Sequence, residues 1–285
     1  MAETLNLVNQ DDIFSCKYEI SQFPDGQQSI RILERTGATF KSLKDQNITI
    51  KSRLNSFKDL ELIICANQAL KEIGVKSIKL YIPYFLGARS DRKFQEGGIH
   101  YIKAVMAPII NSQNFKEVTI LDPHSDVLEG CINNFNKVNN HSLIQMALDD
   151  MSEKENIILV SPDAGAYKKI FDVAQKFNIN EIITATKIRD IKTGNILHTE
   201  ISLNKKDTFK KYVIVDDICD GGRTFIELAK AIKNEKPKSE IYLIVTHGIF
   251  SAGYKQLGEY FERIYTTNSI KDIEGENKIK QQKIF

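Results

Sequence analysis

Two adjacent aspartates and a glycine-rich turn are the residues of this chain best suited to chemistry. Residues 212–215 form an apolar run typical of a buried strand, and Asp216 and Asp217 follow it directly. Residues 220–224, Asp-Gly-Gly-Arg-Thr, then lead into a helical pattern. Such glycines let backbone N–H groups surround a phosphate, and a helix N-terminus adds partial positive charge. Since paired carboxylates can hold ribose hydroxyls or a magnesium ion, the stretch indicates a site for a phosphorylated ribose.

The composition excludes several classes of protein. Hydrophobic residues make up 42% and charged residues 27% of the 285 residues, as in globular proteins. A net charge of +2 gives no reason to expect nucleic acid or a membrane as partner. We find no apolar run long enough to span a bilayer and no signal-peptide pattern. The four cysteines lack the spacing of zinc ligands or of a disulfide framework. We therefore expect a cytoplasmic protein. Cys219 is expected to fill space rather than attack a substrate.

Strand and helix patterns alternate along most of the chain, which predicts parallel sheets covered by helices. Gly74 is the expected end of the first helix. Apolar spacing predicts helices over residues 57–73, 99–110 and 166–177, and strands over residues 77–82, 118–121, 156–160, 181–187, 212–215 and 240–245. The inner face of the third helix is expected to carry Tyr167, Ile170, Phe171 and Ala174.

A polar stretch near the midpoint, residues 133–140, is typical of a surface loop and indicates a domain boundary. We therefore predict two similar α/β domains, residues 1–137 and residues 138–285. Whether the C-terminal tail returns to the first domain is left open.

Ligands of open α/β sheets gather at the carboxyl ends of strands, so polar residues just after predicted strands are candidates. Arg89, Arg92 and Lys93 form a basic cluster after one strand, suited to a polyphosphate or, alternatively, a solvated turn. His124 follows the predicted strand 118–121. Asp163 follows the predicted strand 156–160, and the competing interpretation is that its side chain caps the N-terminus of the next helix. Residues 187–189, Lys-Ile-Arg, follow a fourth, and both cations point to one side if this segment is extended.

Together these motifs resemble one family, the ribose-phosphate pyrophosphokinases, which make phosphoribosyl pyrophosphate. The resemblance runs from about Phe23 to Thr267, most of the chain. Its motifs are residues 23–27 (Phe-Pro-Asp-Gly-Gln), 82–93, 122–124 (Asp-Pro-His), 161–165 (Ser-Pro-Asp-Ala-Gly), 187–189 and 216–224. Jointly they are specific, because a simple phosphoribosyltransferase would need only the last.

The resemblance implies two tandem phosphoribosyltransferase-like domains, each a mostly parallel sheet flanked by helices. Family members transfer the pyrophosphoryl group of ATP to the 1-hydroxyl of ribose 5-phosphate and release AMP. By position, the ribose 5-phosphate site would comprise Asp216, Asp217, Asp220, Gly221, Gly222, Arg223 and Thr224, and the ATP site Phe23, Asp25, Gln27, Arg89, Ser90 and Asp91.

The same resemblance assigns roles to individual side chains. Phe23 and Arg89 would flank the adenine, and Asp25 would accept a hydrogen bond from its amino group. His124 and Asp163 would contact Mg²⁺ on ATP, and the catalytic residues would be Lys187, Arg189 and His124. The family's assembly implies a homo-oligomer, a dimer or hexamer, in which residues 23–27 reach the ATP of a neighbouring subunit.

Some positions depart from the family pattern. Ser90 stands where a glutamine is usual and Gln27 where a glutamate is usual, which loosens the expected selectivity for adenine. Residues 94–100 do not resemble the family's basic regulatory loop, and the terminal helices that contribute to subunit contacts are lacking. Two alternatives are a phosphoribosyltransferase, which would leave the first half idle, and a non-catalytic regulatory homologue. The presence of both Lys187 and Arg189 disfavours the latter.

Overall fold

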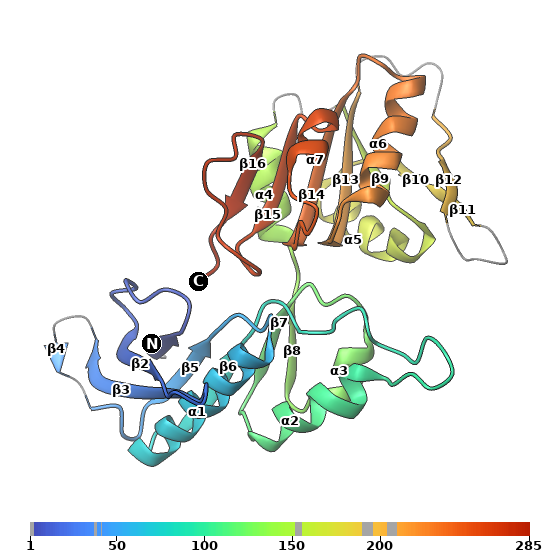
Figure 1. Cartoon of the computed structure of the whole chain (residues 1–285). Helices are drawn as coiled ribbons and strands as arrows, with labels where there is room; N and C mark the ends of the chain where they lie inside the picture. Colours follow the sequence, from blue (N-terminus) through green and yellow to red (C-terminus); the bar gives the residue numbers. More distant parts are fainter. Residues whose placement is uncertain (1–2, 37–38, 41, 152–155, 190–195, 204–209) are drawn as a thin grey trace. The chain divides into compact units, whose positions relative to one another are not determined.

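The computed structural model describes residues 3–36, 39–40, 42–151, 156–189, 196–203 and 210–285, and these divide into two compact units (Figure 1). Unit 1 is residues 1–139 together with Phe285, and unit 2 is residues 140–284. Phe285 belongs to unit 1 because its ring packs edge-on against Tyr81, with centroids 6.1 Å apart, and under the guanidinium of Arg53.

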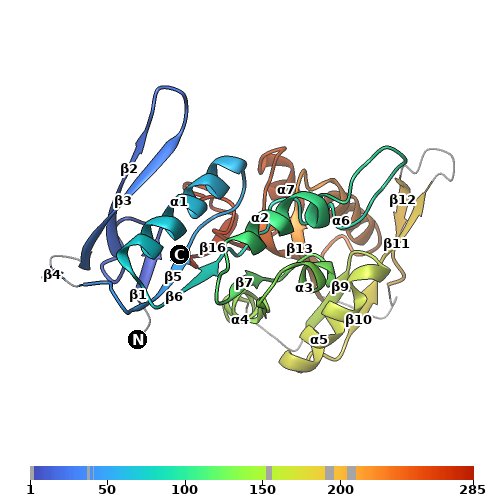
Figure 2. The ribbon, with the colours of Figure 1, turned by 90° about the horizontal axis from the view of Figure 1, so that it is seen from below.

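Unit 1 is built on a parallel sheet. Its strands lie in the order β1 (Glu3–Asn6), β5 (Asn47–Lys51), β6 (Ser77–Tyr81), β7 (Val118–Leu121) and β8 (Phe135–Val138). The helices are α1 (Phe57–Ile73), α2 (Ala107–Ser112) and α3 (Val127–Cys131). A separate antiparallel sheet comprises β2 (Cys16–Gln22), β3 (Gln28–Thr36) and β4 (Thr39–Phe40). Figure 2 shows the hairpin β2–β3 extending away from the parallel sheet.

Helix α1 shows how local sequence sets an element. Ser56 caps its N-terminus by accepting a hydrogen bond from the backbone N–H of Asp59, at 3.2 Å. Gly74 ends it in the left-handed conformation, with φ of 84°, which a residue without a side chain adopts at little cost. Between these ends Leu60, Ile63 and other apolar residues at helical spacing are buried in the core. The predicted helix 57–73 and its end are confirmed.

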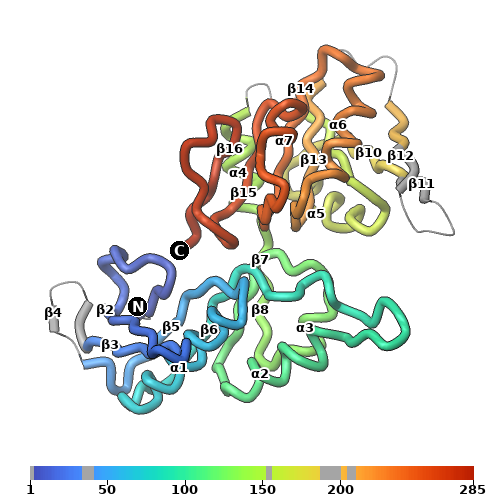
Figure 3. Tube along the Cα trace, viewed as in Figure 1, coloured from blue at the N-terminus to red at the C-terminus, as the bar shows by residue number. Residues whose placement is uncertain are grey.

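Unit 2 contains a second parallel sheet, whose path Figure 3 traces. Its strands lie in the order β10 (Ile182–Thr184), β9 (Ile157–Ser161), β13 (Lys211–Cys219), β14 (Glu240–Gly248), β15 (Arg263–Thr267) and β16 (Ile279–Gln282). The helices are α4 (His141–Asp150), α5 (Tyr167–Phe177), α6 (Arg223–Glu235) and α7 (Lys255–Tyr260). Strands β11 (Thr186–Arg189) and β12 (Ile196–Glu200) form an antiparallel pair.

Strand β13 is the centre of unit 2 because both of its faces are covered. Tyr212 and Ile214 pack in one core cluster with apolar residues of α6. Val213 and Val215 point to the opposite face and pack with α4 and α5. Such two-sided burial is why the strand reads as a continuous apolar run. Parallel sheets covered by helices are therefore confirmed.

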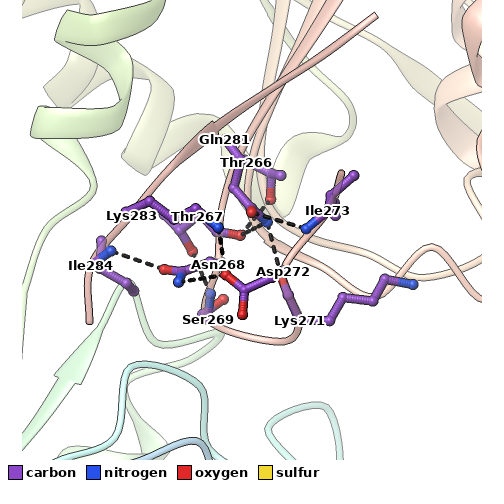
Figure 4. A network of polar contacts seen from close by, with 10 residues as sticks. All are labelled: Thr266, Thr267, Asn268, Ser269, Lys271, Asp272, Ile273, Gln281, Lys283 and Ile284. Atoms are coloured by element: carbon purple, nitrogen blue, oxygen red, sulfur yellow. Dashed lines mark hydrogen bonds and ion pairs between the residues drawn. The ribbon is translucent and has the colours of Figure 1, made fainter. Parts of the chain in front are cut away.

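The segment that follows β15 is fixed by side chains of the C-terminal strand (Figure 4). Gln281 on β16 donates to the backbone oxygens of Thr267 and Lys271, at 3.2 and 2.9 Å, and accepts from the N–H of Ile273. On the same strand, Lys280 pairs at 2.6 Å with Asp150, the last residue of α4. The late strand β16 therefore ties together parts of unit 2 that are distant in sequence.

Several sequence predictions require correction. Residues 133–140 are not only a loop, because they include the edge strand β8. A helix is found where residues 99–110 predicted one, but it starts later and its first part, Ile102–Met106, is π-helical before α2 begins. The predicted strand 181–187 is two strands, because the chain leaves the parallel sheet after β10 and enters the hairpin β11–β12. Strands β13 and β14 run four and three residues further than predicted, since backbone pairing continues past the apolar run.

The predicted inner face of the third helix is also partly wrong. Ile170 and Ala174 are buried, but Tyr167 and Phe171 are 46% and 43% exposed. Val173 takes their place, because the buried stripe of α5 runs through Ile170, Val173 and Ala174 and leaves the aromatic pair on its flank. In the described part of the chain, no helix is long and apolar enough to cross a membrane.

Candidate ribose-phosphate and nucleotide site

The acidic pair lies within β13 rather than after it. Asp216 pairs with Val245 in the ladder to β14, and its Oδ1 accepts a 2.9 Å hydrogen bond from the backbone N–H of Asp217. Asp217 is buried and Asp216 half-buried. Extended backbone and this hydrogen bond fix the orientation of the Asp216 carboxylate at the carboxyl end of the strand.

Burial and like charge both act on this pair. Desolvation, followed by the negative charge of Asp217, raises the pKa of Asp216 well above its ordinary value. The positive charge of Lys169, a half-buried residue of α5, lowers the same pKa. Sequence reasoning missed Lys169.

The glycine turn leads directly into α6. Gly222 is its N-cap, with φ of 81°, and its carbonyl accepts hydrogen bonds from the N–H groups of Phe225 and Ile226, both at 3.0 Å. A side chain there would also be crowded, because a Cβ on Gly222 would lie 3.0 Å from Leu257. Arg223 is exposed at the first helical position, and Thr224 is half-buried beside it. The turn thus presents the N-terminus of a 13-residue helix, as an anion site requires.

Cys219 is buried at the end of β13. Desolvation, followed by the charges of Asp216 and Asp220, raises the pKa of its thiol to about 12. A thiol with such a pKa remains protonated near neutral pH and is a poor nucleophile. The burial of Cys219 agrees with its interpretation as a space-filling residue.

A loop after β14 supports the glycine turn. The N–H groups of Ile249 and Phe250 donate to the carbonyl of Cys219, at 2.8 and 3.1 Å. Ser251 donates twice to Asp220, from its N–H to the carbonyl at 3.1 Å and from its hydroxyl to Oδ1 at 2.7 Å. Sequence reasoning missed Ser251 because the predicted strand 240–245 ended too early to place it beside the turn.

Asp163 lies at the end of β9, next to β13 in the sheet. Its Oδ1 accepts a 3.2 Å hydrogen bond from the N–H of Ala166, so it caps the short 3₁₀ helix Ala164–Ala166. The N-cap interpretation is therefore confirmed. Because β9 and β13 are parallel neighbours, Asp163 and the acidic pair share one edge of the sheet.

Lys187 and Arg189 both lie on β11. In the ladder their backbones pair with Thr199 and Ile196 of β12. The register shifts between Ile188 and Arg189, an irregularity that interrupts the alternation on which a common side was predicted. Their side chains lie outside the part of the structure that is described.

In unit 1, two candidate loops leave neighbouring strands. The loop after β6 carries Arg89, Ser90 and Asp91, and the loop after β7 carries His124. A 3.1 Å hydrogen bond from the N–H of Leu121 to the carbonyl of Pro83 joins their starting points. Arg89 and His124 are exposed, so this edge offers a cation and an imidazole to a ligand.

Phe23, Asp25 and Gln27 lie at the tip of the β2–β3 hairpin. The carbonyl of Phe23 accepts a hydrogen bond from the N–H of Gly26, and Oδ1 of Asp25 accepts one from the N–H of Gln27, at 3.1 Å. Phe23 is 52% exposed. Figure 2 shows this tip well apart from the teal loop that follows β6. The hairpin tip and the loop that carries Arg89 are therefore separate parts of unit 1.

No three histidine, cysteine, aspartate or glutamate side chains are grouped to hold a metal within the described residues. A magnesium site needs fewer protein ligands, since one or two carboxylates suffice where substrate phosphates and water complete the octahedral shell. The half-buried carboxylate of Asp163, at the carboxyl edge of the unit 2 sheet, fits such a shell.

Comparison with known proteins places this geometry in a family. The model of the phosphoribosyl transferase domain matches residues 133–281. The chain belongs to that family. The matched phosphoribosyl transferase domain contains Asp163, the acidic pair and the glycine turn, so the candidate sugar-phosphate loop lies inside it.

Relatives extend the similarity over most of the chain. The ribose-phosphate pyrophosphokinase of Pyrococcus abyssi is 27% identical over 265 residues, covering 88% of this chain and 84% of that protein. That of Mycoplasma genitalium is 27% identical over 275 residues, covering 93% and 79%. The phosphoribosylpyrophosphate synthetase structure from Mycobacterium smegmatis superposes with a TM-score of 0.82 at 16% identity, covering 99% of this chain and 94% of that one. The resemblance to ribose-phosphate pyrophosphokinases, the expectation of an enzyme and the predicted fold are confirmed.

Proposed function

We propose that this chain transfers the pyrophosphoryl group of ATP to the 1-hydroxyl of ribose 5-phosphate, giving 5-phosphoribosyl 1-pyrophosphate and AMP. The observation that carries the proposal is the arrangement of Asp216, Asp217 and the glycine turn. The carboxylate pair lies on β13, where a hydrogen bond fixes Asp216, and the N-terminus of α6 follows after one short turn. That arrangement suits a ligand with hydroxyls at one end and a phosphate at the other.

Binding of the sugar phosphate follows from this geometry. Backbone N–H groups of residues 221–224, the hydroxyl of Thr224 and the guanidinium of Arg223 bind the 5-phosphate, and the helix dipole favours its negative charge. The carboxylates of Asp216 and Asp217 accept hydrogen bonds from the ribose hydroxyls. Because burial disfavours the charge on Asp216, donors from the sugar and the nearby Lys169 stabilise its ionised form.

ATP binding is assigned to the unit 1 residues. Phe23 and Arg89 hold the two faces of the adenine, and Asp25 accepts a hydrogen bond from its amino group. Gln27, Ser90 and Asp91 complete the set. Because Phe23 lies at an exposed hairpin tip, apart from the Arg89 loop, we assign Phe23 to the ATP of a second copy in a homo-oligomer. Sedimentation of the purified protein, which gives the mass in solution, tests the oligomer.

In the reaction, the ribose 1-hydroxyl oxygen forms a bond to the β-phosphorus and loses its proton. The bond from that phosphorus to the oxygen bridging to the α-phosphate breaks, and AMP leaves with the oxygen. Alignment and cations aimed at the developing charge are the main sources of acceleration. Lys187 and Arg189 supply such cations. Asp163 and His124 are each assigned a contact to magnesium, which would neutralise charge on the phosphates of ATP when bound.

A phosphorus NMR assay tests the proposal. Purified protein is incubated with ATP, magnesium and ribose 5-phosphate, and parallel samples omit the sugar. AMP and phosphoribosyl pyrophosphate should appear together and only with the sugar. ATP binding without product would instead favour a regulatory homologue. Consumption of added phosphoribosyl pyrophosphate that requires a nucleobase and releases pyrophosphate would favour a phosphoribosyltransferase.

A further inference from the structure

Residues 248–253, the end of β14 and the loop after it, form four hydrogen bonds with Cys219 at the end of β13 and Asp220 at the start of the glycine turn, and we name them the bracing segment. Three of the bonds run from backbone N–H groups to the carbonyls of Cys219 and Asp220. The fourth joins two side chains, from the Ser251 hydroxyl to Oδ1 of Asp220, at 2.7 Å. The first three fix the backbone at Cys219 and Asp220. The fourth acts on the side-chain carboxylate of Asp220.

The bracing segment is itself held in an unusual conformation. Phe250 has φ of 48°, a left-handed value that a non-glycine residue rarely adopts. Its ring is buried and packs edge-on against Tyr254, with centroids 5.2 Å apart. The ring also lies so close to Gly248 that a Cβ there would be 2.1 Å away. Strain of this kind persists where surrounding structure enforces it, so Ser251 is presented by a rigid support.

Asp220 presents an electrostatic problem for the turn. Its carboxylate precedes Gly221 at the start of the segment to which the proposed function assigns a phosphate. A carboxylate turned toward a phosphate dianion repels it. In the structure Oδ1 of Asp220 is instead held by the Ser251 hydroxyl, and hydrogen bonds to an ionised acceptor are among the stronger ones.

We propose that Ser251 is a positioning residue for phosphate-monoester binding, which holds the Asp220 carboxylate on the bracing segment and away from the anion. The inference rests on the proposed function and adds a second-loop residue to its site. Ser251 acts through Asp220 and not by touching the substrate. Its effect should therefore depend on the charge of Asp220.

A double-mutant cycle read by calorimetric titration with ribose 5-phosphate tests this dependence, because the readout is affinity and not turnover. Ser251→Ala should weaken binding about tenfold in the wild-type background. In an Asp220→Asn background, where no charge can turn toward the phosphate, the same substitution should cost less than about twofold. Ser251→Thr keeps the hydroxyl and should bind as the wild type does.

Ser142 provides the matched control, since it is an exposed serine of unit 2 whose hydroxyl donates to the side chain of Gln282. Ser142→Ala should leave affinity unchanged. Equal losses from Ser251→Ala in both backgrounds would overturn the proposal, as would no loss in either. Ser251 is exposed, so truncation is not expected to unfold the protein. A wild-type protein that fails to bind ribose 5-phosphate would count against the proposed function itself, a distinct outcome.

Discussion

The ammonium group of Lys169 stabilises the carboxylate of Asp216, and the two residues come from neighbouring elements, α5 and β13. Burial and the charge of Asp217 raise the pKa of Asp216, and Lys169 acts in the opposite sense. Ile170 and Val215, which adjoin Lys169 and Asp216 in the chain, belong to one buried core cluster, so the packing of α5 on the sheet brings the two charged residues to the same region.

Lys169→Met should therefore impair use of ribose 5-phosphate. We expect KM for the sugar phosphate to rise about tenfold, because a charge-assisted stabilisation of Asp216 is lost. The turnover number should change less. Lys168→Met is the control, since Lys168 is the exposed neighbour on the same helix. Steady-state kinetics at saturating ATP measure both constants, and similar effects of the two substitutions would contradict the assignment.

Asp216→Asn should stabilise the protein near neutral pH. A carboxyl pKa raised in the folded state means that the native protein binds the proton more tightly, so stability falls as pH rises above the ordinary value of 3.8. The asparagine removes that loss and still accepts the hydrogen bond from Asp217. Thermal unfolding should show a higher Tm for the variant at neutral pH and a vanishing difference below pH 3.8. Asp172→Asn, at an exposed position of α5, should show no such dependence.

Gly222→Ala should destabilise unit 2 by about 2–3 kcal/mol, through a left-handed φ of 81° and a close approach to Leu257. Gly275→Ala separates the two causes, because Gly275 has φ of 76° but open space around its Cβ position. That control should cost only about 1 kcal/mol. Urea unfolding measures both values, and equal losses would show that the contact with Leu257 is unimportant.

Lys187→Ala should lower the turnover number at least about a hundredfold while KM for both substrates stays within about threefold. The reason is that a cation aimed at the developing charge acts in the transition state and contributes little to ground-state binding. Lys238→Ala, at an exposed position before β14, is the control. Rapid-quench measurement of AMP formation separates the chemical step from product release. Loss of affinity equal to the loss of turnover would remove Lys187 from its proposed role.

Elements with strong local signals could be predicted from the sequence. Helix α1 has a serine cap, an apolar stripe and a terminal glycine, and its predicted bounds are those of the structure. Strand β7 is also found at the predicted residues, 118–121. The site's strand-end placement followed from the same patterns, because β9 and β13 are parallel neighbours.

Features that depend on partners far along the chain could not be predicted. The extension of β13 to Cys219 arises from pairing with β14, and nothing local to two aspartates and an isoleucine indicates it. Phe171 is placed on the flank of α5 by the packing of Val173 against the sheet. Ser251 approaches Asp220 only because the long β14 delivers it there, and a serine beyond an apolar run carries no signal of that contact.

The sheet of unit 2 also has a consequence for biosynthesis. Among the described strands β16 pairs with β15 alone, yet its Gln281 and Lys280 fix the segment after β15 and the end of α4. Unit 1 needs no such late strand, since its sheet is complete at β8. During translation, unit 1 can therefore assemble its sheet while unit 2 is being made. Unit 2 must wait with β15 as its sheet edge until residues 279–282 have been made, so its sheet is completed later than that of unit 1.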